Sequence, residues 1–153
     1  MQADFSRPTL AIDTSTGYLS LALHSDGQTL LHHIEAGNRQ SEQILPQIGA
    51  LFAQAGISAA DLGAIVYAQG PGAFTGLRIG MSTAKAMAYA WQVPLVGVMT
   101  MDAIAHNCVG TDDLVVVMID AQKKNVYEGR YEWRDGAMQQ IQAPTVKLRA
   151  DAL

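Results

Sequence analysis

The first third of the chain has the spacing of apolar residues that is typical of β-strands. A short apolar run predicts a buried strand over residues 8–13. Leucine at every second position from Leu19 to Leu23 predicts another strand over residues 18–24. The following Asp26-Gly27 pair is a strong hairpin signal, so a third strand should cover residues 28–35. The chain is therefore predicted to open with an antiparallel meander.

Beyond residue 36 the spacing becomes helical, and helices then alternate with short apolar runs. Apolar positions with a period near 3.6 predict a helix that begins near Ser41 or Gln43 and ends at Gly56. Pro46 is tolerated there if the helix begins near Gln43, and would kink it otherwise. The later elements are predicted as a strand over 64–68, a long helix over about 75–91, a strand over 95–99, a helix to about Asn107, and strands over 114–119, 125–134 and 138–142.

The order βββαβαβα, followed by a new run of strands, predicts the fold class. The first part matches the ribonuclease-H-like unit shared by actin, sugar kinases and Hsp70. We therefore expect an α/β protein with a ribonuclease-H-like, actin-like ATPase (ASKHA) fold. The first domain should cover residues 1–110, and residues 111–153 should begin a second, incomplete β-rich domain.

A glycine-rich loop over residues 70–80 is the sharpest candidate for chemistry. A strand, then Gly-Pro-Gly, then a helix N-terminus presents free backbone N–H groups, and the helix dipole favours an anion there. The same pattern also fits a plain tight turn between a strand and a helix. The turn at Asp13 likewise fits either phosphate binding or a capped turn. The candidate phosphate-binding residues are Asp13, Thr14, Gly70, Gly72, Thr75 and Arg78.

The long helix after this loop has two unusual features. Arg78 is expected in its first turn, where the helix dipole disfavours a cation. It should therefore meet an anion, a nearby carboxylate such as Asp13, or a partner protein. Small residues lie on almost every side of the helix, which favours packing on two sides, one of them against a partner.

Composition and charge exclude several classes of function. A net charge of −4 gives no sign of free-standing nucleic-acid binding, so any role with a nucleic acid should be indirect or shared with a partner. The single Cys108 cannot form an internal disulfide, and no His-x-x-x-His pair occurs. We expect no metal and no cofactor. No signal peptide or membrane-spanning run is recognised, so a cytoplasmic protein is expected.

Several stretches resemble the bacterial TsaB (YeaZ) family. They are Leu10-Ala11-Ile12-Asp13-Thr14-Ser15-Thr16 with Ser20-Leu21-Ala22-Leu23, Ser41-Glu42-Gln43-Ile44-Leu45-Pro46, Gly70 to Gly80, and Ile119-Asp120-Ala121 with Val126-Tyr127. The resemblance implies a non-catalytic scaffold for the paralogue TsaD, which transfers a threonylcarbamoyl group to an adenosine beside the tRNA anticodon. It also implies the ATPase TsaE as a third partner, a homodimer when alone, and tRNA contact only through the complex.

The resemblance also assigns roles to individual residues. Partner contacts are expected at Ile44, Ile48, Gly76, Met81, Ala84 and Lys85. The histidine pair that holds the metal in the catalytic paralogue falls at Thr100 and Ile104 here, and neither side chain suits a metal. This substitution implies that the chain is not itself an enzyme.

Some residues depart from the family pattern, and two other functions stay open. Gln122 stands where an arginine is usual, and Lys123-Lys124 where many members have a glycine. The chain ends at Leu153, whereas family members usually continue through a fuller second domain. The alternatives are an ASKHA-type ATP-binding phosphotransferase or ATPase that uses Asp13, and an M22-type metallopeptidase.

Overall fold

The computed structural model describes residues 2–152, which form two compact units. The first unit runs as far as Gln69 and resumes at Ala73–Val98. The second unit takes Gly70–Gly72 and the described chain from Met99 onward. The units therefore divide the chain earlier than the expected boundary after residue 110, because the helix after Met99 shares a core with the second sheet.

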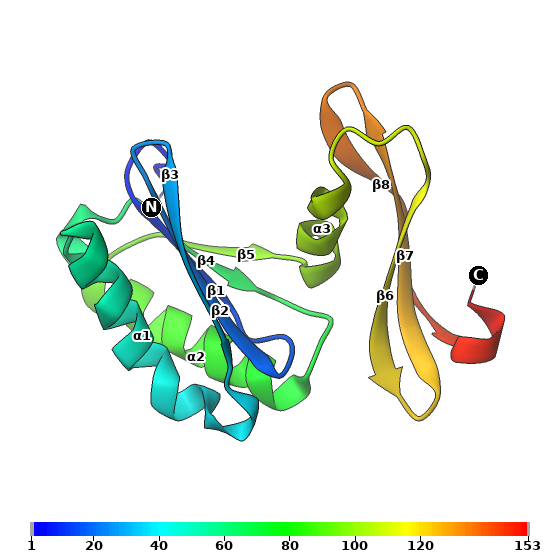
Figure 1. The fold of residues 1–153 in the computed structure, drawn as a ribbon, viewed down its shortest axis with the longest axis horizontal. Helices are drawn as coiled ribbons and strands as arrows, with labels where there is room; N and C mark the ends of the chain where they lie inside the picture. The colour runs from blue at the N-terminus through cyan, green and yellow to red at the C-terminus, as the bar shows by residue number, and fades with distance from the viewer. Residues whose placement is uncertain (1, 153) are drawn as a thin grey trace. The chain divides into compact units, whose positions relative to one another are not determined.

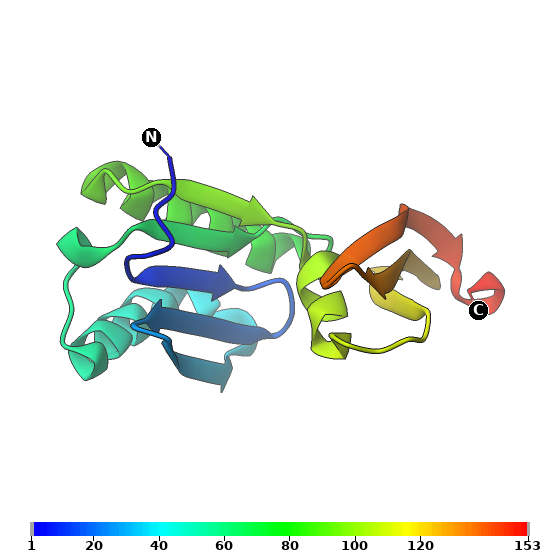
Figure 2. The ribbon, with the colours of Figure 1, turned by 90° about the horizontal axis from the view of Figure 1, so that it is seen from above.

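A five-stranded mixed sheet forms the centre of the first unit, with the order β3-β2-β1-β4-β5 (Figures 1 and 2). The central strand β1 pairs antiparallel with β2 and parallel with β4. This order confirms the predicted ribonuclease-H-like α/β fold. The strands are β1 (Thr9–Asp13), β2 (Tyr18–Ser25), β3 (Gln28–Glu35), β4 (Ala64–Ala68) and β5 (Leu95–Val98).

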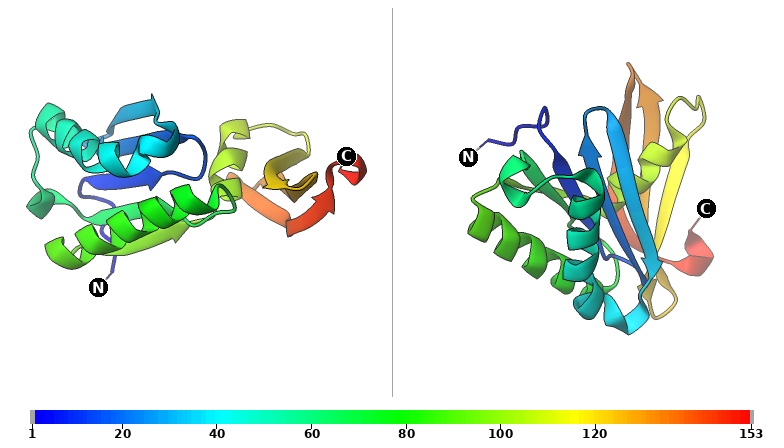
Figure 3. Two further views of the ribbon diagram at one scale, coloured as in Figure 1. Left: turned by 90° about the horizontal axis from the view of Figure 1, so that it is seen from below. Right: turned by 60° about the vertical axis from the view of Figure 1, so that its left-hand side comes forward.

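Two helices, α1 (Gln40–Ala55) and α2 (Phe74–Trp91), cover the same face of this sheet (Figure 3). The strand register brings Leu10 of β1 between Leu23 of β2 and Ile65 of β4, and all three are fully or almost fully buried. They pack with the apolar stripes of both helices in one core, to which Phe52 and Trp91 add a tilted aromatic pair. Burial of this single sheet face accounts for the alternating leucines of the sequence.

Helix α1 begins and ends at residues that explain its length. It starts at Gln40, just before the predicted start, and the buried Gln40 amide donates to the carbonyl oxygens of Thr16 and Tyr18. It ends at Gly56, which takes the predicted left-handed conformation with φ of 67°. Pro46 lies well inside the helix and past its first turn, where it removes one backbone hydrogen-bond donor.

A three-stranded antiparallel sheet, β6-β7-β8, forms the second unit with helix α3 (Thr100–Ala105) against it (Figure 1). Met101 and Ala105 of α3 are fully buried against Val117 and Tyr131. Strand β8 continues beyond the predicted residue 142 and runs through Pro144, which an edge strand tolerates. The strands are β6 (Val115–Gln122), β7 (Asn125–Arg134) and β8 (Ala137–Leu148).

The tight turns of the two sheets differ in how well their residues suit the backbone. Asp26 and Gly27 both have positive φ, at 51° and 74°, as a two-residue hairpin of the predicted kind requires. The β7–β8 turn at Asp135-Gly136 has the same conformation. The β6–β7 turn places Lys123 and Lys124 at φ of 51° and 67°, a conformation that lysine adopts only at a cost. Short 3₁₀ turns lie at Gly37–Arg39, Ala59–Asp61, His106–Cys108 and Arg149–Asp151.

Candidate functional site

The turn after β1 is bound tightly to the first turn of α2. The backbone N–H of Ala73 donates to the carbonyl oxygen of Ser15 at 2.6 Å. The buried Thr14 hydroxyl donates to the carbonyl oxygen of Gly76 at 2.7 Å. These two contacts join residues that are about sixty positions apart in the sequence, and they fix the start of α2 against the sheet.

Glycine is required at two positions of α2 because of this close approach. A Cβ atom on Gly76 would overlap the carbonyl oxygen of Thr14, and one on Gly80 would overlap the Thr14 hydroxyl. Ala84 and Met87 continue the same buried side of the helix. The small residues at Gly76, Gly80 and Ala84 are thus explained by packing within the first unit, and no partner is needed to account for them.

The candidate phosphate-binding residues fall into two groups. Asp13 accepts a hydrogen bond from the backbone N–H of Ser15 at 2.7 Å, as in a capped turn, and Thr75 lies exposed at the start of α2. Gly70 and Gly72 belong to the second unit, where the carbonyl oxygen of Gly70 accepts from the backbone N–H of Thr100 at 2.8 Å. Asp13 and Thr14 therefore lie where the end of β1 and the following turn contact the start of α2, whereas Gly70 and Gly72 belong to the second unit.

Ser15 lies in the turn after β1, beside the candidate residues Asp13 and Thr14. Its side chain is only 3% exposed, and its Oγ has no hydrogen-bond partner among residues 2–152. A buried hydroxyl without a partner is costly unless something outside the chain satisfies it. In the sequence, the run of small polar residues over Asp13–Thr16 is the feature that points to Ser15.

Four of the six expected partner contacts lie inside the first unit. Ile44, Ile48 and Ala84 are at most 3% exposed, and Gly76 is buried against Thr14. Their side chains belong to the core between the helices and the sheet, so they do not form a docking surface. The family resemblance placed these four residues in partner contacts, whereas in the structure they face the interior of the first unit. Met81 is partly buried, and Lys85 is exposed.

The outer side of α2 carries a line of four exposed residues, which we call the α2 outer line: Phe74, Arg78, Lys85 and Tyr89. At 100° per residue they fall within about 60° of one another around the helix axis. Phe74 and Tyr89 are 72% and 82% exposed, which is unusual for aromatic side chains. The Arg78 guanidinium carbon lies 5.4 Å from the centre of the Phe74 ring, a cation–π distance.

The position of Arg78 differs from the expected one. Helix α2 begins at Phe74, so Arg78 starts its second turn rather than lying in the first. Within the described part of the chain, Arg78 forms no ion pair with Asp13 or any other carboxylate. Of the three roles that the sequence left open, pairing with Asp13 does not occur.

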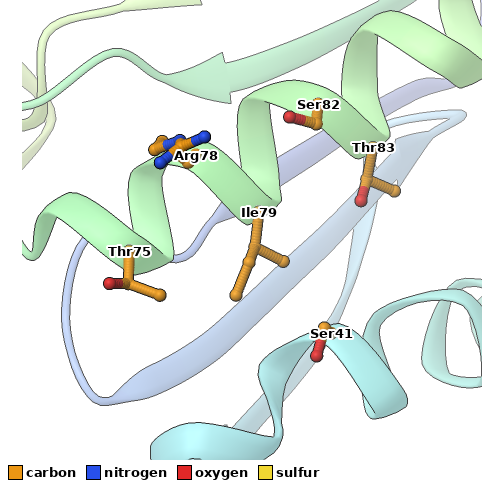
Figure 4. Close-up of a pocket in the computed structure, with 6 residues that line it drawn as sticks. All are labelled: Ser41, Thr75, Arg78, Ile79, Ser82 and Thr83. Atoms are coloured by element: carbon orange, nitrogen blue, oxygen red, sulfur yellow. The ribbon is translucent and has the colours of Figure 1, made fainter.

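A groove runs beside the outer line, between α1 and α2. Thr75, Ile79 and Thr83 project from α2 toward α1, where Ser41 lies, and Arg78 and Ser82 of α2 complete the lining (Figure 4). Farther along the two helices the hollow becomes apolar. This apolar part is lined by Leu45, Ser82, Thr83, Ala86, Met87, Ala90 and Trp91.

Helix α3 holds the two positions at which the resemblance places metal ligands. Thr100 is 3% exposed and Ile104 is 39% exposed, one turn apart on the same helix. Between them, Asp102 accepts a hydrogen bond from the Tyr131 hydroxyl at 2.8 Å. Burial, with Asp102 beside it, raises the pKa of Tyr131 to about 12. Within residues 2–152 no group of three or more His, Cys, Asp or Glu side chains is placed to hold a metal ion.

Glu128 is a second feature that the sequence did not reveal. Its buried carboxylate accepts from Lys147 at 2.7 Å and from Arg130 at 3.1 Å, both through Oε1, which ties β7 to β8. The hydrogen bond from Lys147 is the main cause that holds the pKa of Glu128 below its usual value.

None of the helices in the described chain has both the length and the apolar character that crossing a membrane requires.

Comparison with known proteins identifies a family. The family model for TsaD, the tRNA N6-adenosine threonylcarbamoyltransferase, matches residues 34–153. A tRNA threonylcarbamoyladenosine biosynthesis protein TsaB from Bacillus subtilis is 32% identical over 145 residues, which are 94% of this chain and 63% of that protein. The TsaB protein of Escherichia coli is 34% identical over 125 residues, which are 80% of this chain and 54% of that protein.

Solved structures agree with the sequence comparison. YeaZ from Pseudomonas aeruginosa superposes with a TM-score of 0.86 at 32% identity, and covers 93% of this chain and 68% of that one. The chain spans 54% and 63% of the lengths of the two TsaB relatives. The similarity to this solved structure therefore extends over both units of the fold.

Proposed function

Because the chain belongs to the TsaB/YeaZ family, we propose that it takes part in forming threonylcarbamoyladenosine in tRNA, as a partner subunit of a TsaD-type transferase. The observation that supports this proposal most directly is the exposed surface of α1 and α2 in the first unit. The surface combines the apolar groove with the α2 outer line, and so offers aromatic and aliphatic side chains to a protein partner.

The contact residues in this proposal are the exposed ones. Leu45 of α1 is 57% exposed at the groove, and Tyr89 of α2 is 82% exposed beside it. Lys85 and Met81 stay in the proposed surface as an exposed and a partly buried residue. The buried Ile44, Ile48, Gly76 and Ala84 take the role of holding the two helices in place.

The chemistry of α3 favours a supporting role over a catalytic one. Threonine and isoleucine replace the histidines that the resemblance to the catalytic paralogue would require, and isoleucine has no atom that can ligate a metal. Asp102, the remaining carboxylate, is already hydrogen-bonded to Tyr131. We infer that the paralogue catalyses the transfer step and that a TsaE-type ATPase belongs to the same complex. In this proposal the chain contacts tRNA only through the complex, and the complex acts in the cytoplasm.

A binding experiment tests the proposed surface. Leu45→Glu should reduce binding to the transferase encoded in the same genome at least tenfold, measured by calorimetry, because it places a charge in the apolar groove. Leu31→Glu is the matched control. Leu31 is similarly exposed, at 64%, but lies on β3 beside Leu30, which points into the core, so it faces away from both helices.

An assay of tRNA modification tests whether the chain supports the transferase. Addition of the chain to the transferase, the ATPase, ATP and threonylcarbamoyl donor should increase modification of tRNA, and Leu45→Glu should remove the increase. If the chain alone modifies tRNA, or if Leu45→Glu and Leu31→Glu bind the transferase equally well, the proposal fails. Light scattering on the chain alone tests the expected homodimer through the same face.

One observation favours the second candidate, an ATP-binding phosphotransferase or ATPase. The unsatisfied Ser15 hydroxyl lies in the turn that contacts the start of α2, and Asp13 is adjacent to it. Calorimetry with ATP and Mg²⁺ examines this candidate directly. Tight binding that is lost in both Asp13→Ala and Ser15→Ala would support it, whereas heat changes equal to those of buffer would exclude it.

A further inference from the structure

Three two-residue hairpin turns in the chain share one backbone conformation but differ in composition. In two of them the Asp26-Gly27 and Asp135-Gly136 pairs take positive φ, and Asp-Gly is a pair that this conformation favours. The β6–β7 turn instead has Lys123 and Lys124 at φ of 51° and 67°. Lysine carries a Cβ atom that is strained in this region, whereas glycine has none. The backbone of the turn therefore does not explain the two lysines.

Packing within the second unit does not explain Lys123 and Lys124 either. Both residues are exposed at the tip of the hairpin. Among residues 2–152 neither ammonium group has a carboxylate within salt-bridge distance. Backbone strain that no contact within the fold requires is more often found where side chains serve a function. The function of these two side chains should therefore depend on their charge and on something outside the chain.

The groups beside the turn add a third cation. The backbone N–H of Arg149 donates to the carbonyl oxygen of Lys124 at 2.8 Å, so Arg149 lies next to the turn. Asp120, the carboxylate nearest to the turn along the chain, accepts from the Arg149 guanidinium at 3.2 Å and from the backbone N–H of Gln122 at 3.1 Å. Both partners of that ion pair are mostly exposed, so it restrains the arginine only weakly. Asp151, the other carboxylate near Arg149 in the sequence, forms no ion pair within the described residues.

We propose, resting on the function proposed above, that Lys123, Lys124 and Arg149 bind the phosphate backbone of tRNA when the chain is part of the transferase complex. Lysine and arginine side chains bind phosphate oxygens without reading the base sequence, and arginine offers them a planar fork of donors. tRNA is the polyanion that the proposed function brings to the complex, which favours phosphate over an acidic protein surface.

The net charge of the whole chain is compatible with this contact. Affinity for a phosphate backbone increases with the number of phosphates that a protein neutralises, and three cations neutralise few. The chain has a net charge of −4, so the turn should not hold tRNA by itself. It adds to the contacts that the rest of the complex makes, and its effect is measured in the complex.

The first experiment measures binding of tRNA to the complex of chain and transferase, by filter binding at several salt concentrations. Lys123→Gln combined with Lys124→Gln should weaken binding about tenfold and reduce the slope of log K against log salt concentration by about two. The loss should be equal for tRNAs with different anticodons, because phosphates and not bases are contacted. Arg134→Gln is the matched control. It removes a cation at the opposite end of β7 from the turn and should bind tRNA as the wild type does.

A second pair of substitutions gives two readouts of opposite sign. Lys123→Asn combined with Lys124→Gly supplies the residues that the turn conformation favours, so the melting temperature of the chain should rise. Binding of tRNA to the complex should fall as it does in the glutamine variant. A melting temperature that falls or stays the same would remove the strain on which the inference rests.

The outcomes separate this inference from the proposed function. Wild-type tRNA affinity and salt slope in both lysine variants would overturn the inference, and so would weaker binding to the transferase in place of weaker binding to tRNA, which would indicate an acidic protein surface. If Leu45→Glu prevents assembly while the lysine variants bind tRNA normally, the proposed function stands and this inference alone fails.

Discussion

The inner and outer sides of α2 differ in both the size and the charge of their side chains. The inner side is built from small uncharged residues, Gly76, Gly80 and Ala84, that let Thr14 and the sheet approach closely. The outer side carries two aromatic rings and two cations, all exposed. One helix therefore has a side whose residues are determined by packing and a side that packing leaves free.

This difference teaches how small residues should be interpreted. Glycine and alanine in a helix are often taken as a sign of a protein–protein contact, but here the glycines are used within the chain. The surface that we propose for a partner is marked instead by large side chains that nothing in the first unit covers. The two sides should respond to substitution in opposite ways, which gives the following tests in order of expected size.

The largest effect is expected from Gly76→Ala. The added methyl group would overlap the carbonyl oxygen of Thr14, and the helix would have to move away from the sheet. We expect the free energy of unfolding to fall by about 3 kcal/mol, measured by urea denaturation. A loss below about 0.5 kcal/mol would mean that the close approach of Thr14 is not needed.

Thr14→Val should have the next largest effect. Valine keeps the shape of threonine but leaves the carbonyl oxygen of Gly76 without its buried donor. A loss of about 1–2 kcal/mol in the free energy of unfolding is expected, again by urea denaturation. Thr75→Val, which removes an exposed hydroxyl one residue before Gly76, is the control and should change little.

Substitution of a glycine outside α2 should raise the free energy of unfolding instead of lowering it. Gly49 lies exposed inside α1, and a Cβ atom there would meet nothing within 4 Å. Gly49→Ala should therefore stabilise the protein by about 0.8 kcal/mol through helix propensity alone. The rise in melting temperature measures this gain, and a fall would show that α1 has a constraint that the packing does not reveal.

The smallest effect on stability is expected on the outer side. Phe74→Ala and Tyr89→Ala should each change the free energy of unfolding by less than about 0.5 kcal/mol, since both side chains are largely exposed. Both should nevertheless weaken binding to the transferase in calorimetry. If either variant lost stability but still bound the transferase normally, the outer side of α2 would serve packing and not the partner contact.

The sequence predicted the fold well because its signals are local. The alternating leucines, the two Asp-Gly turns and Gly56 each determine a strand, a hairpin or a helix end through nearest neighbours alone. Strand β8 is longer than predicted and runs through Pro144, which is acceptable there because the strand lies at the edge of the sheet.

The site was predicted less well because the direction in which a side chain points depends on parts of the chain that are far away in the sequence. Helical spacing identified Ile44 and Ile48 as part of one apolar side of α1, but whether that side faces the sheet or a partner depends on where the sheet lies. The contact of Thr14 with Gly76 and Gly80 joins distant parts of the chain and leaves no periodic signal. The ring of Phe74 beneath Arg78 is local, at a spacing of four, and could have been inferred from the sequence.

The division into two units has a consequence for spectroscopy. The chain has two tryptophans, and the units share them equally: Trp91 packs with Phe52 in the first unit, and Trp133 lies on β7 of the second. Each unit thus contains its own intrinsic fluorophore. Unfolding followed in Trp91→Phe and Trp133→Phe variants would report the two cores separately, and a difference between their midpoints would measure how far one core can melt while the other stays folded.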